Sequence, residues 1–220
     1  VAGDVILSGR SGGTIAAVYT TGVNLANALT IAAGNLTIQG SSLVGGIATP
    51  LPGSSATGSR YGFSSAAAGD ITVSGNISLV GTSVTYMGAY LLGDIISSDG
   101  NVALTGAGLY AMSLSGPVTA GTGVNPRTLT ITGTGSNGYG LNVGAAATLS
   151  ATGSIALTAY STTGARGIAV AAPIRSTLRG DVVVSAYAGG GAGDHAFDLS
   201  AALSTANGGI TLQGSALVGG

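Results

Sequence analysis

The stretch that decides the fold is Arg127 to Gly153, "RTLTITGTGSNGYGLNVGAAATLSATG". Its first part, Thr128 to Thr132, alternates threonine with leucine and isoleucine, and this period of two is typical of a β-strand with one buried face. A Gly/Ser turn follows, then a second short strand after Tyr139, and then an apolar-polar patch that ends at another glycine. The stretch therefore predicts one coil of a stacked β-structure.

Similar units recur along the whole chain, which is the sequence signature of a repeat architecture. The first apolar residues of the units are 26 to 35 residues apart, about 29 on average and near 27 in the second half. A second motif with Gly, an aromatic residue or Arg lies inside each period, and a third apolar patch often follows it. The first apolar residues are Val5, Leu36, Ile71, Val102, Leu129, Ile155, Val182 and Ile210.

A longer repeat is superimposed on the short one. Residues 28–46 match residues 202–220 at 12 of 19 positions, at an offset of 174, and the segments that precede them correspond at an offset of 177. Six short periods therefore form one super-repeat. The pattern is interrupted at both ends of the sequence, so we expect a segment of a longer array.

These periods predict an all-β fold, a right-handed parallel β-helix (β-solenoid) of about seven coils of about 27–31 residues, occupying residues 1–220 as a single segment. One coil cannot bury its apolar edge alone, whereas stacked coils bury it and pair their backbone groups. Gly-Asp pairs, as at Gly3 and Gly180, predict corners. Pro50 and Pro52 exclude a central strand, so we expect a corner loop at 47–60.

Composition supports this fold and limits the function. The chain has no Lys, Glu or Cys, and 41 of its 220 residues are glycine, so we expect essentially no helix and no disulfide. A net charge of −1 gives no reason to bind nucleic acid. No stretch approaches the roughly 18 apolar residues of a membrane helix, so we expect no membrane insertion.

The chemistry-bearing residues are few, and we expect no enzyme and no cofactor. Seven Asp without Glu or Lys make an acid-base groove hard to build. Asp194 and Asp198, in a glycine-rich stretch, are weak candidates for a metal site. Arg179-Gly180-Asp181 spells an adhesion tripeptide, although it leads directly into a strand.

One column of residues varies in chemistry between coils and is the expected place for surface contacts. It contains Arg60 with Tyr61, then Tyr139, Arg166 and His195. A glycan-binding face would instead need exposed aromatic side chains in line. The tyrosines to map are Tyr19, Tyr61, Tyr86, Tyr90, Tyr110, Tyr139, Tyr160 and Tyr187.

Three stretches, "GDITVSGNISLVG", "TLTITGTGSNGYGLNVGAAATLSATGSIALTA" and "GNLTIQGSSLVGG", resemble the repeats of filamentous-haemagglutinin-like adhesins and related autotransporter passengers. The resemblance spans the chain and is compositional and periodic. It implies a right-handed parallel β-helix exported to the bacterial cell surface, where it acts as an adhesive or biofilm fibre. The period here is longer than the roughly twenty residues usual in haemagglutinin-type coils.

Three functions remain open at this point. The first is a structural segment of an extracellular adhesin or cell-surface fibre, a rigid rod whose partners include glycans or host receptors. The second is a filament subunit that polymerises end to end with further copies of the same repeat. The third is a carbohydrate-binding or carbohydrate-cleaving β-helix.

Overall fold

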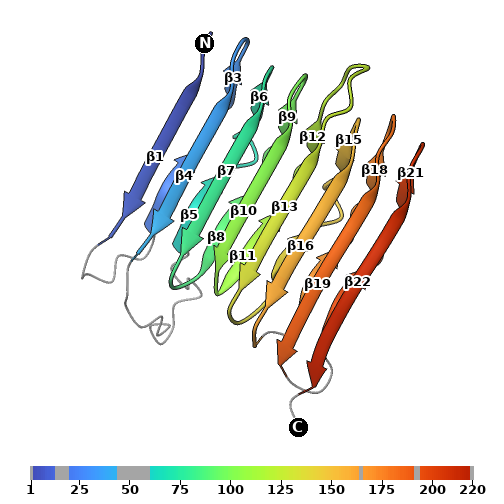
Figure 1. Cartoon of the computed structure of the whole chain (residues 1–220). Coiled ribbons are helices and arrows are strands. Elements are labelled where there is room, and N and C mark those ends of the chain that lie inside the picture. The colour runs from blue at the N-terminus through green and yellow to red at the C-terminus, as the bar shows by residue number, and fades with distance from the viewer. Residues whose placement is uncertain (1, 13–19, 44–59, 164–165, 191–193, 219–220) are drawn as a thin grey trace.

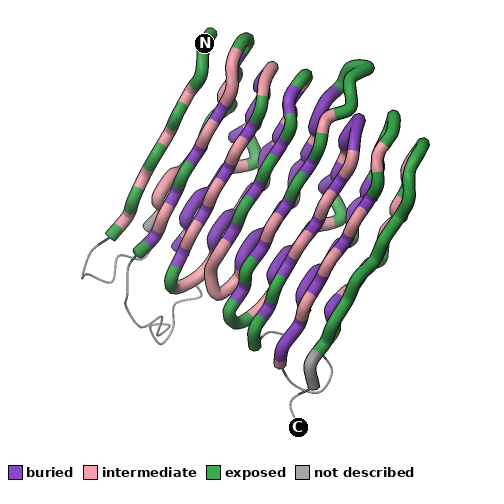
Figure 2. The backbone as a smooth tube through the Cα atoms, viewed as in Figure 1, coloured by how far each residue is buried: buried purple, intermediate pink, exposed green. Residues whose placement is uncertain are grey.

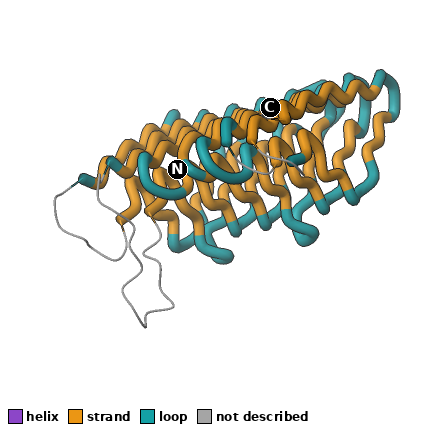
Figure 3. Tube along the Cα trace, turned by 90° about the horizontal axis from the view of Figure 1, so that it is seen from below, coloured by secondary structure: helices purple, strands orange, loops and turns teal. Residues whose placement is uncertain are grey.

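The computed structural model describes residues 2–12, 20–43, 60–163, 166–190 and 194–218. Within these ranges every regular element is a β-strand, and the strands form about seven coils that stack along one axis (Figure 1). Figure 3 shows the same stack from below, with strands along its sides and loops at its corners. The predicted all-β parallel solenoid without helix is confirmed.

Each coil contributes one strand to each of three parallel sheets, which we call the long, middle and short sheets. The long sheet contains β1 (Val5–Ser11), β4 (Leu36–Ser42), β7 (Ile77–Ser83), β10 (Val102–Gly108), β13 (Leu129–Gly135), β16 (Ile155–Ser161), β19 (Val182–Gly190) and β22 (Ile210–Val218). The middle sheet contains β2 (Thr20–Leu25), β5 (Arg60–Ser65), β8 (Met87–Leu91), β11 (Tyr110–Leu114), β14 (Leu141–Val143), β17 (Arg166–Val170) and β20 (His195–Leu199). The short sheet contains β3 (Leu29–Ile31), β6 (Ile71–Val73), β9 (Ile95–Ser97), β12 (Val118–Ala120), β15 (Leu149–Ala151), β18 (Ile174–Ser176) and β21 (Leu203–Thr205).

The core is a set of apolar columns that run the length of the stack. In β13 the first and third residues, Leu129 and Ile131, are fully buried, while Thr130 between them is exposed. Figure 2 shows the same alternation of buried and less buried positions along the inner strands. Each buried Val, Leu or Ile contributes about 1.5–3 kcal/mol, so several per coil stabilise a long, thin core.

One predicted strand belongs to a different sheet. The sequence places Ile71 in the column of Leu36 and Val102, but Ile77 is the residue that pairs with both of them. Ile71 begins β6 in the short sheet and lies beside Leu29. The prediction was wrong because both strands alternate and follow Asp or Asn, so alternation alone does not separate them.

Glycine in the long sheet allows two sheets to approach closely. The fifth residue of these strands faces inward, and a Cβ added at Gly133 would lie 2.0 Å from the carbonyl oxygen of Gly140, next to the middle sheet. The same contact would be 2.1 Å between Gly40 and the Gly62 carbonyl oxygen. A side chain larger than hydrogen therefore cannot be added at these points without moving backbone. The column consists of Gly9, Gly40, Gly81, Gly106, Gly133, Ala159, Ala186 and Gly214.

A polar ladder links successive coils just before the long strands. The Oδ1 of Asn76 accepts a hydrogen bond from the backbone N–H of Asn101 at 2.9 Å, and the Oδ1 of Asn101 accepts one from Thr128 at 2.8 Å. Asp4 and Asp181 accept in the same way from the following coil. The side chains thereby satisfy backbone donors at corners, where the strand ladders end.

Some of the corners predicted from Gly-Asp pairs contain glycine with positive φ. Gly3 and Gly180 have φ of 104° and 141°, in the region that favours glycine. The predicted loop at 47–60 lies outside the described residues except for Arg60. Residues 121–127 join β12 to β13 without a strand, and Arg127 ties this segment to Asp99 through a 2.5 Å ion pair.

The first and last long strands each have a neighbour on one side within the described residues. Val5 and Leu7 of β1 are half-buried, whereas their counterparts in the inner strands are buried. Ile210 and Leu212 of β22 are 45% and 49% exposed. Apolar core positions are therefore open at both ends of the described stack.

Candidate functional site

The middle sheet brings the predicted column of variable residues together. Tyr61 and Tyr110 are both register partners of Met87. Further along, Ala111 donates its N–H to the carbonyl oxygen of Tyr139, which continues the column. The column then reaches the next two coils of the middle sheet, at the start of β17 and of β20.

Five tyrosines form a continuous group on this side of the stack, which we call the tyrosine stripe: Tyr61, Tyr86, Tyr90, Tyr110 and Tyr139. The Tyr61 and Tyr90 rings stack with centroids 5.1 Å apart, and Tyr86 meets Tyr61 and Tyr110 edge to face at 5.7 and 5.6 Å. Tyr139 lies 6.4 Å from Tyr110. Aromatic pairs prefer stacked and edge-to-face arrangements of this kind. Neighbouring rings therefore cover much of the surface of each ring.

The environment of Tyr86 reflects this packing. Burial, and to a smaller degree the neighbouring phenols of Tyr61, Tyr110 and Tyr90, raise the pKa of the Tyr86 hydroxyl above its ordinary value of 10.0. Tyr86 therefore stays protonated at neutral pH and keeps a hydroxyl that can donate a hydrogen bond.

The stripe ends at a pair of charged residues. The guanidinium of Arg166 lies 5.8 Å from the ring centroid of Tyr139, and its Nη1 is 2.7 Å from Oδ2 of Asp198. His195 is exposed and is the register partner of Arg166 on the neighbouring strand. Arg166 thus has both a ring and a carboxylate as partners in the folded protein.

The weak metal candidates, Asp194 and Asp198, do not gather further ligands. Asp198 faces Arg166, a cation that would compete with a metal ion for its carboxylate. Across the described ranges, no group of three or more His, Cys, Asp or Glu side chains is placed to hold a metal. A site built on these two carboxylates stays a sequence-based prediction.

The adhesion tripeptide lies at a corner directly before β19. Arg179 and Asp181 are exposed, and Gly180 adopts the positive φ given above. The Oδ1 of Asp181 accepts a hydrogen bond from the backbone N–H of Gly209 at 2.7 Å, so this carboxylate belongs to the polar ladder.

Arg60 was predicted as a surface contact, but only 7% of it is exposed. It begins β5, and its carbonyl oxygen accepts a hydrogen bond from the Ser83 hydroxyl at 2.9 Å. Little of Arg60 can therefore touch a ligand. Tyr19 lies outside the described residues.

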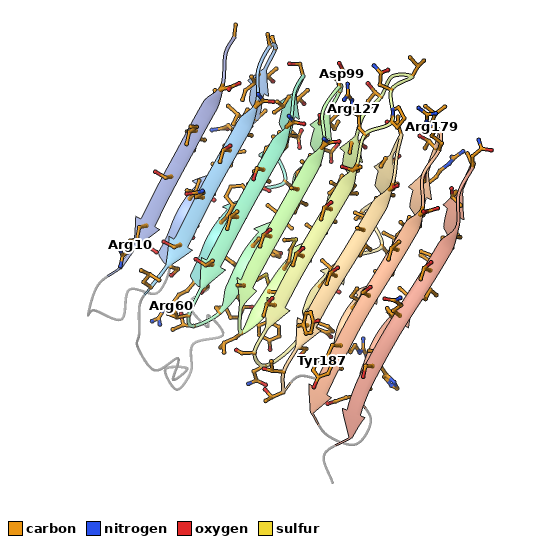
Figure 4. The ribbon with its side chains drawn as sticks, viewed as in Figure 1. Arg10, Arg60, Asp99, Arg127, Arg179 and Tyr187 are labelled. Atoms are coloured by element: carbon orange, nitrogen blue, oxygen red, sulfur yellow. The ribbon has the colours of Figure 1, made fainter. Side chains whose placement is uncertain are left out.

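Tyr160 and Tyr187 form a separate aromatic pair on the outer face of the long sheet. They are register partners in β16 and β19, and their ring centroids are 5.6 Å apart. Figure 4 shows Tyr187 near the lower end of these strands, on the side that faces the viewer. Both tyrosines belong to the set to be mapped from the sequence, in which they were not separated from those of the stripe. The signal was available, because each is the sixth residue of a long strand, an outward position.

A scan against protein-family models found no match to this chain, and searches of curated proteins and of solved structures found none either. In the described part of the chain there is no helix of the length and apolarity needed to cross a membrane.

Proposed function

We propose that the chain is a structural segment of an extracellular bacterial adhesin or cell-surface fibre, in which it supplies length and rigidity. The observation that carries this proposal is the long sheet, whose eight strands pair in parallel register along the whole described stack. Stacked strands are roughly 4.8 Å apart, so seven steps extend about 34 Å. The resemblance to filamentous-haemagglutinin-like repeats supports the location and the adhesive context.

The chemistry of the coils is consistent with a spacer. The charged fraction is 6%, and the ion pairs Arg127–Asp99 and Arg166–Asp198 each connect neighbouring coils. These charged side chains therefore form contacts between neighbouring coils. In such a rod the number of coils matters more than the identity of any one of them.

Removal of one whole coil tests this proposal. Leu129 and Ile155 are register partners, so deletion of residues 129–154 joins two coils in register. We expect the shortened protein to fold, to reach the cell surface and to support adhesion, with a rod about 4.8 Å shorter. Protease accessibility on intact cells and a cell-adhesion assay measure the two properties.

The control deletes residues 129–141, half a coil, which removes β13 and breaks the register. We expect this variant to lose surface display. If the whole-coil deletion is displayed normally but no longer adheres, the segment carries the binding function itself and the rod proposal is wrong.

A second candidate function is a filament subunit that pairs end to end with further copies, favoured by the match of residues 28–46 to residues 202–220 at 12 of 19 positions. Coils of neighbouring copies could then stack as successive coils do within the chain. The purified chain should then form fibres visible by electron microscopy, and Leu212→Asp should prevent them. A monodisperse solution of the unmodified chain at high concentration would exclude this function.

A further inference from the structure

The outer face of the long sheet carries a shallow trough across β16, β19 and β22, which encloses about 240 Å³. Its walls are the fourth and sixth residues of these strands, which point outward, and its floor is the backbone at the small fifth residue. The enclosed volume is slightly below the roughly 300 Å³ at which small-molecule sites begin, so the trough suits a short, weakly bound segment of a ligand.

Two tyrosines form one wall of the trough. Tyr160 is 50% exposed, and its ring is tilted by 35° from that of Tyr187. The equivalent positions in other coils are Ser41, Thr82 and Thr134, so the fold does not require an aromatic residue here. The pair is therefore an aromatic platform at a position that is polar in those coils.

The opposite wall is polar and uncharged. It contains Thr158, Ser185 and Gln213, and the Ser185 hydroxyl lies 3.4 Å from Oε1 of Gln213. None of the residues that line the trough carries a charge. A ligand suited to it has an apolar face, several hydroxyl groups and no net charge.

From this geometry we propose that the trough formed by Tyr160, Tyr187, Thr158, Ser185 and Gln213 binds an uncharged polysaccharide. A pyranose ring has a C–H face that stacks on a phenol ring and equatorial hydroxyls that hydrogen-bond to amide and hydroxyl groups. The chain of sugars lies across β16, β19 and β22, along the axis of the stack. An acidic or sulfated glycan finds no cation in the trough.

The tyrosine stripe on the middle sheet is less suited to this ligand. All five of its rings are half-buried, whereas Tyr160 in the trough is 50% exposed, and Arg166 at the end of the stripe already faces a ring and a carboxylate. Tyr110 and Tyr139 therefore provide a matched control pair, with the same residue type on another face.

Affinity electrophoresis of the purified chain tests the proposal. Native gels contain laminarin, hydroxyethyl cellulose, glucomannan or mannan as uncharged probes, and heparin as a charged one. We expect retardation by at least one uncharged polysaccharide and none by heparin. Tyr160→Ala combined with Tyr187→Ala should weaken the retardation at least tenfold in apparent Kd, whereas Tyr110→Ala combined with Tyr139→Ala should leave it unchanged.

One further variant and a folding control keep the test decisive. Tyr160→Phe combined with Tyr187→Phe retains the stacking surface and should retain most of the binding, and circular dichroism confirms that each variant is folded. No retardation by any uncharged polysaccharide overturns the proposal, as does unchanged retardation of the alanine pair. A lateral dimer in sedimentation that the alanine pair dissolves would also overturn it, because the platform would then be covered by a second copy. This binding test does not depend on adhesion. It can fail while the coil-deletion test supports the rod proposal, and the coil-deletion test can fail while polysaccharide binding is observed.

Discussion

At the scale of single residues, the least expected feature is the inward glycine column. Glycine was predicted at corners, and Gly3 and Gly180 confirm that use. Glycines inside strands, which were not predicted, let the long and middle sheets meet backbone to backbone. The spacing of the pattern "TLTITG" contained this signal, because its glycine occupies an inward position of the alternation that otherwise holds Leu129 and Ile131.

Gly133→Ala tests this close approach. The added Cβ would meet the Gly140 carbonyl oxygen at 2.0 Å, and backbone cannot rotate away as a side chain can. We expect a loss of about 1–3 kcal/mol in the free energy of unfolding, measured by urea denaturation. The control is Gly123→Ala, where no heavy atom lies within 4 Å and the change should be close to neutral. Two equal losses would show that the sheets do not pack this closely.

Ile131→Asp and Thr130→Asp test which face of β13 is buried. Ile131 is 0% exposed, and a carboxylate there would be desolvated without a partner, so we expect a loss of several kcal/mol. Thr130 points outward, and its replacement should be nearly silent. Thermal denaturation of the two variants compares them directly, and similar melting temperatures would contradict the assigned face.

The pKa of Asp99 tests the ion pair between Asp99 and Arg127. The hydrogen bond and charge of Arg127 hold the pKa of the exposed Asp99 carboxyl below its ordinary value of 3.8. A lowered pKa in the folded state means that any stabilisation is present above the ordinary pKa and is lost as the pH falls through the folded-state pKa. Carboxyl chemical shifts in an NMR titration should give a midpoint below 3.8, and Arg127→Gln should raise it. A midpoint that this substitution leaves unchanged would rule out the ion pair in solution.

At the scale of strands and coils, the fold was largely predictable, and one register was not. Alternating apolar residues predict the long strands because each has one buried face. The short strand at Ile71 has the same alternation over only three residues, and nothing in the alternation says to which sheet it belongs. In the structure Asn76, directly before Ile77, bonds with Asn35 of the previous coil and Asn101 of the next, but Asp70 before Ile71 bonds in the same way with Asp94.

Site residues were harder to predict, for a physical reason. The column through Tyr61, Tyr139, Arg166 and His195 could be placed because register follows from aligned repeats. Burial of Arg60 and the contacts between tyrosine rings depend on how the sheets turn at the corner next to β5 and β8. A one-dimensional pattern does not contain that turn.

Asn101→Ala tests the polar ladder. The substitution removes the acceptor of the Thr128 N–H and leaves that donor to water, so we expect a loss of about 1 kcal/mol. Asn101→Asp keeps an acceptor oxygen, as Asp4 and Asp181 do in their own coils, and should retain most of the stability. Chemical denaturation of the pair decides the matter, and equal losses would mean that the side-chain oxygen contributes nothing.

At the scale of the whole molecule, stability depends on neighbours. Each coil contacts the one before it and the one after it, as in other linear repeat proteins. The inner strands β10 and β13 are paired on both sides, whereas β1 and β22 are paired on one side within the described stack. Local opening should therefore become less favourable from the ends toward the centre.

Amide hydrogen exchange should record this gradient. We expect the slowest exchange in β10 and β13 and the fastest in β1 and β22, where opening breaks fewer neighbouring contacts. Exchange measured by NMR or mass spectrometry compares the strands within one sample. Uniform protection along the stack would show that the segment unfolds as a single unit instead.

The direction of the strand pairing also determines how the segment responds to tension. Strands lie across the axis, so the backbone hydrogen bonds between coils point along it. A load applied to the two ends of the segment therefore opens one interface after another, and the outermost coil peels away first. Each event frees about 27 residues, or roughly 90 Å of extended chain. If a cell were attached through such a rod, a sudden pulling force would first extend the rod in a series of small steps. Only afterwards would the full force act on the attachment point.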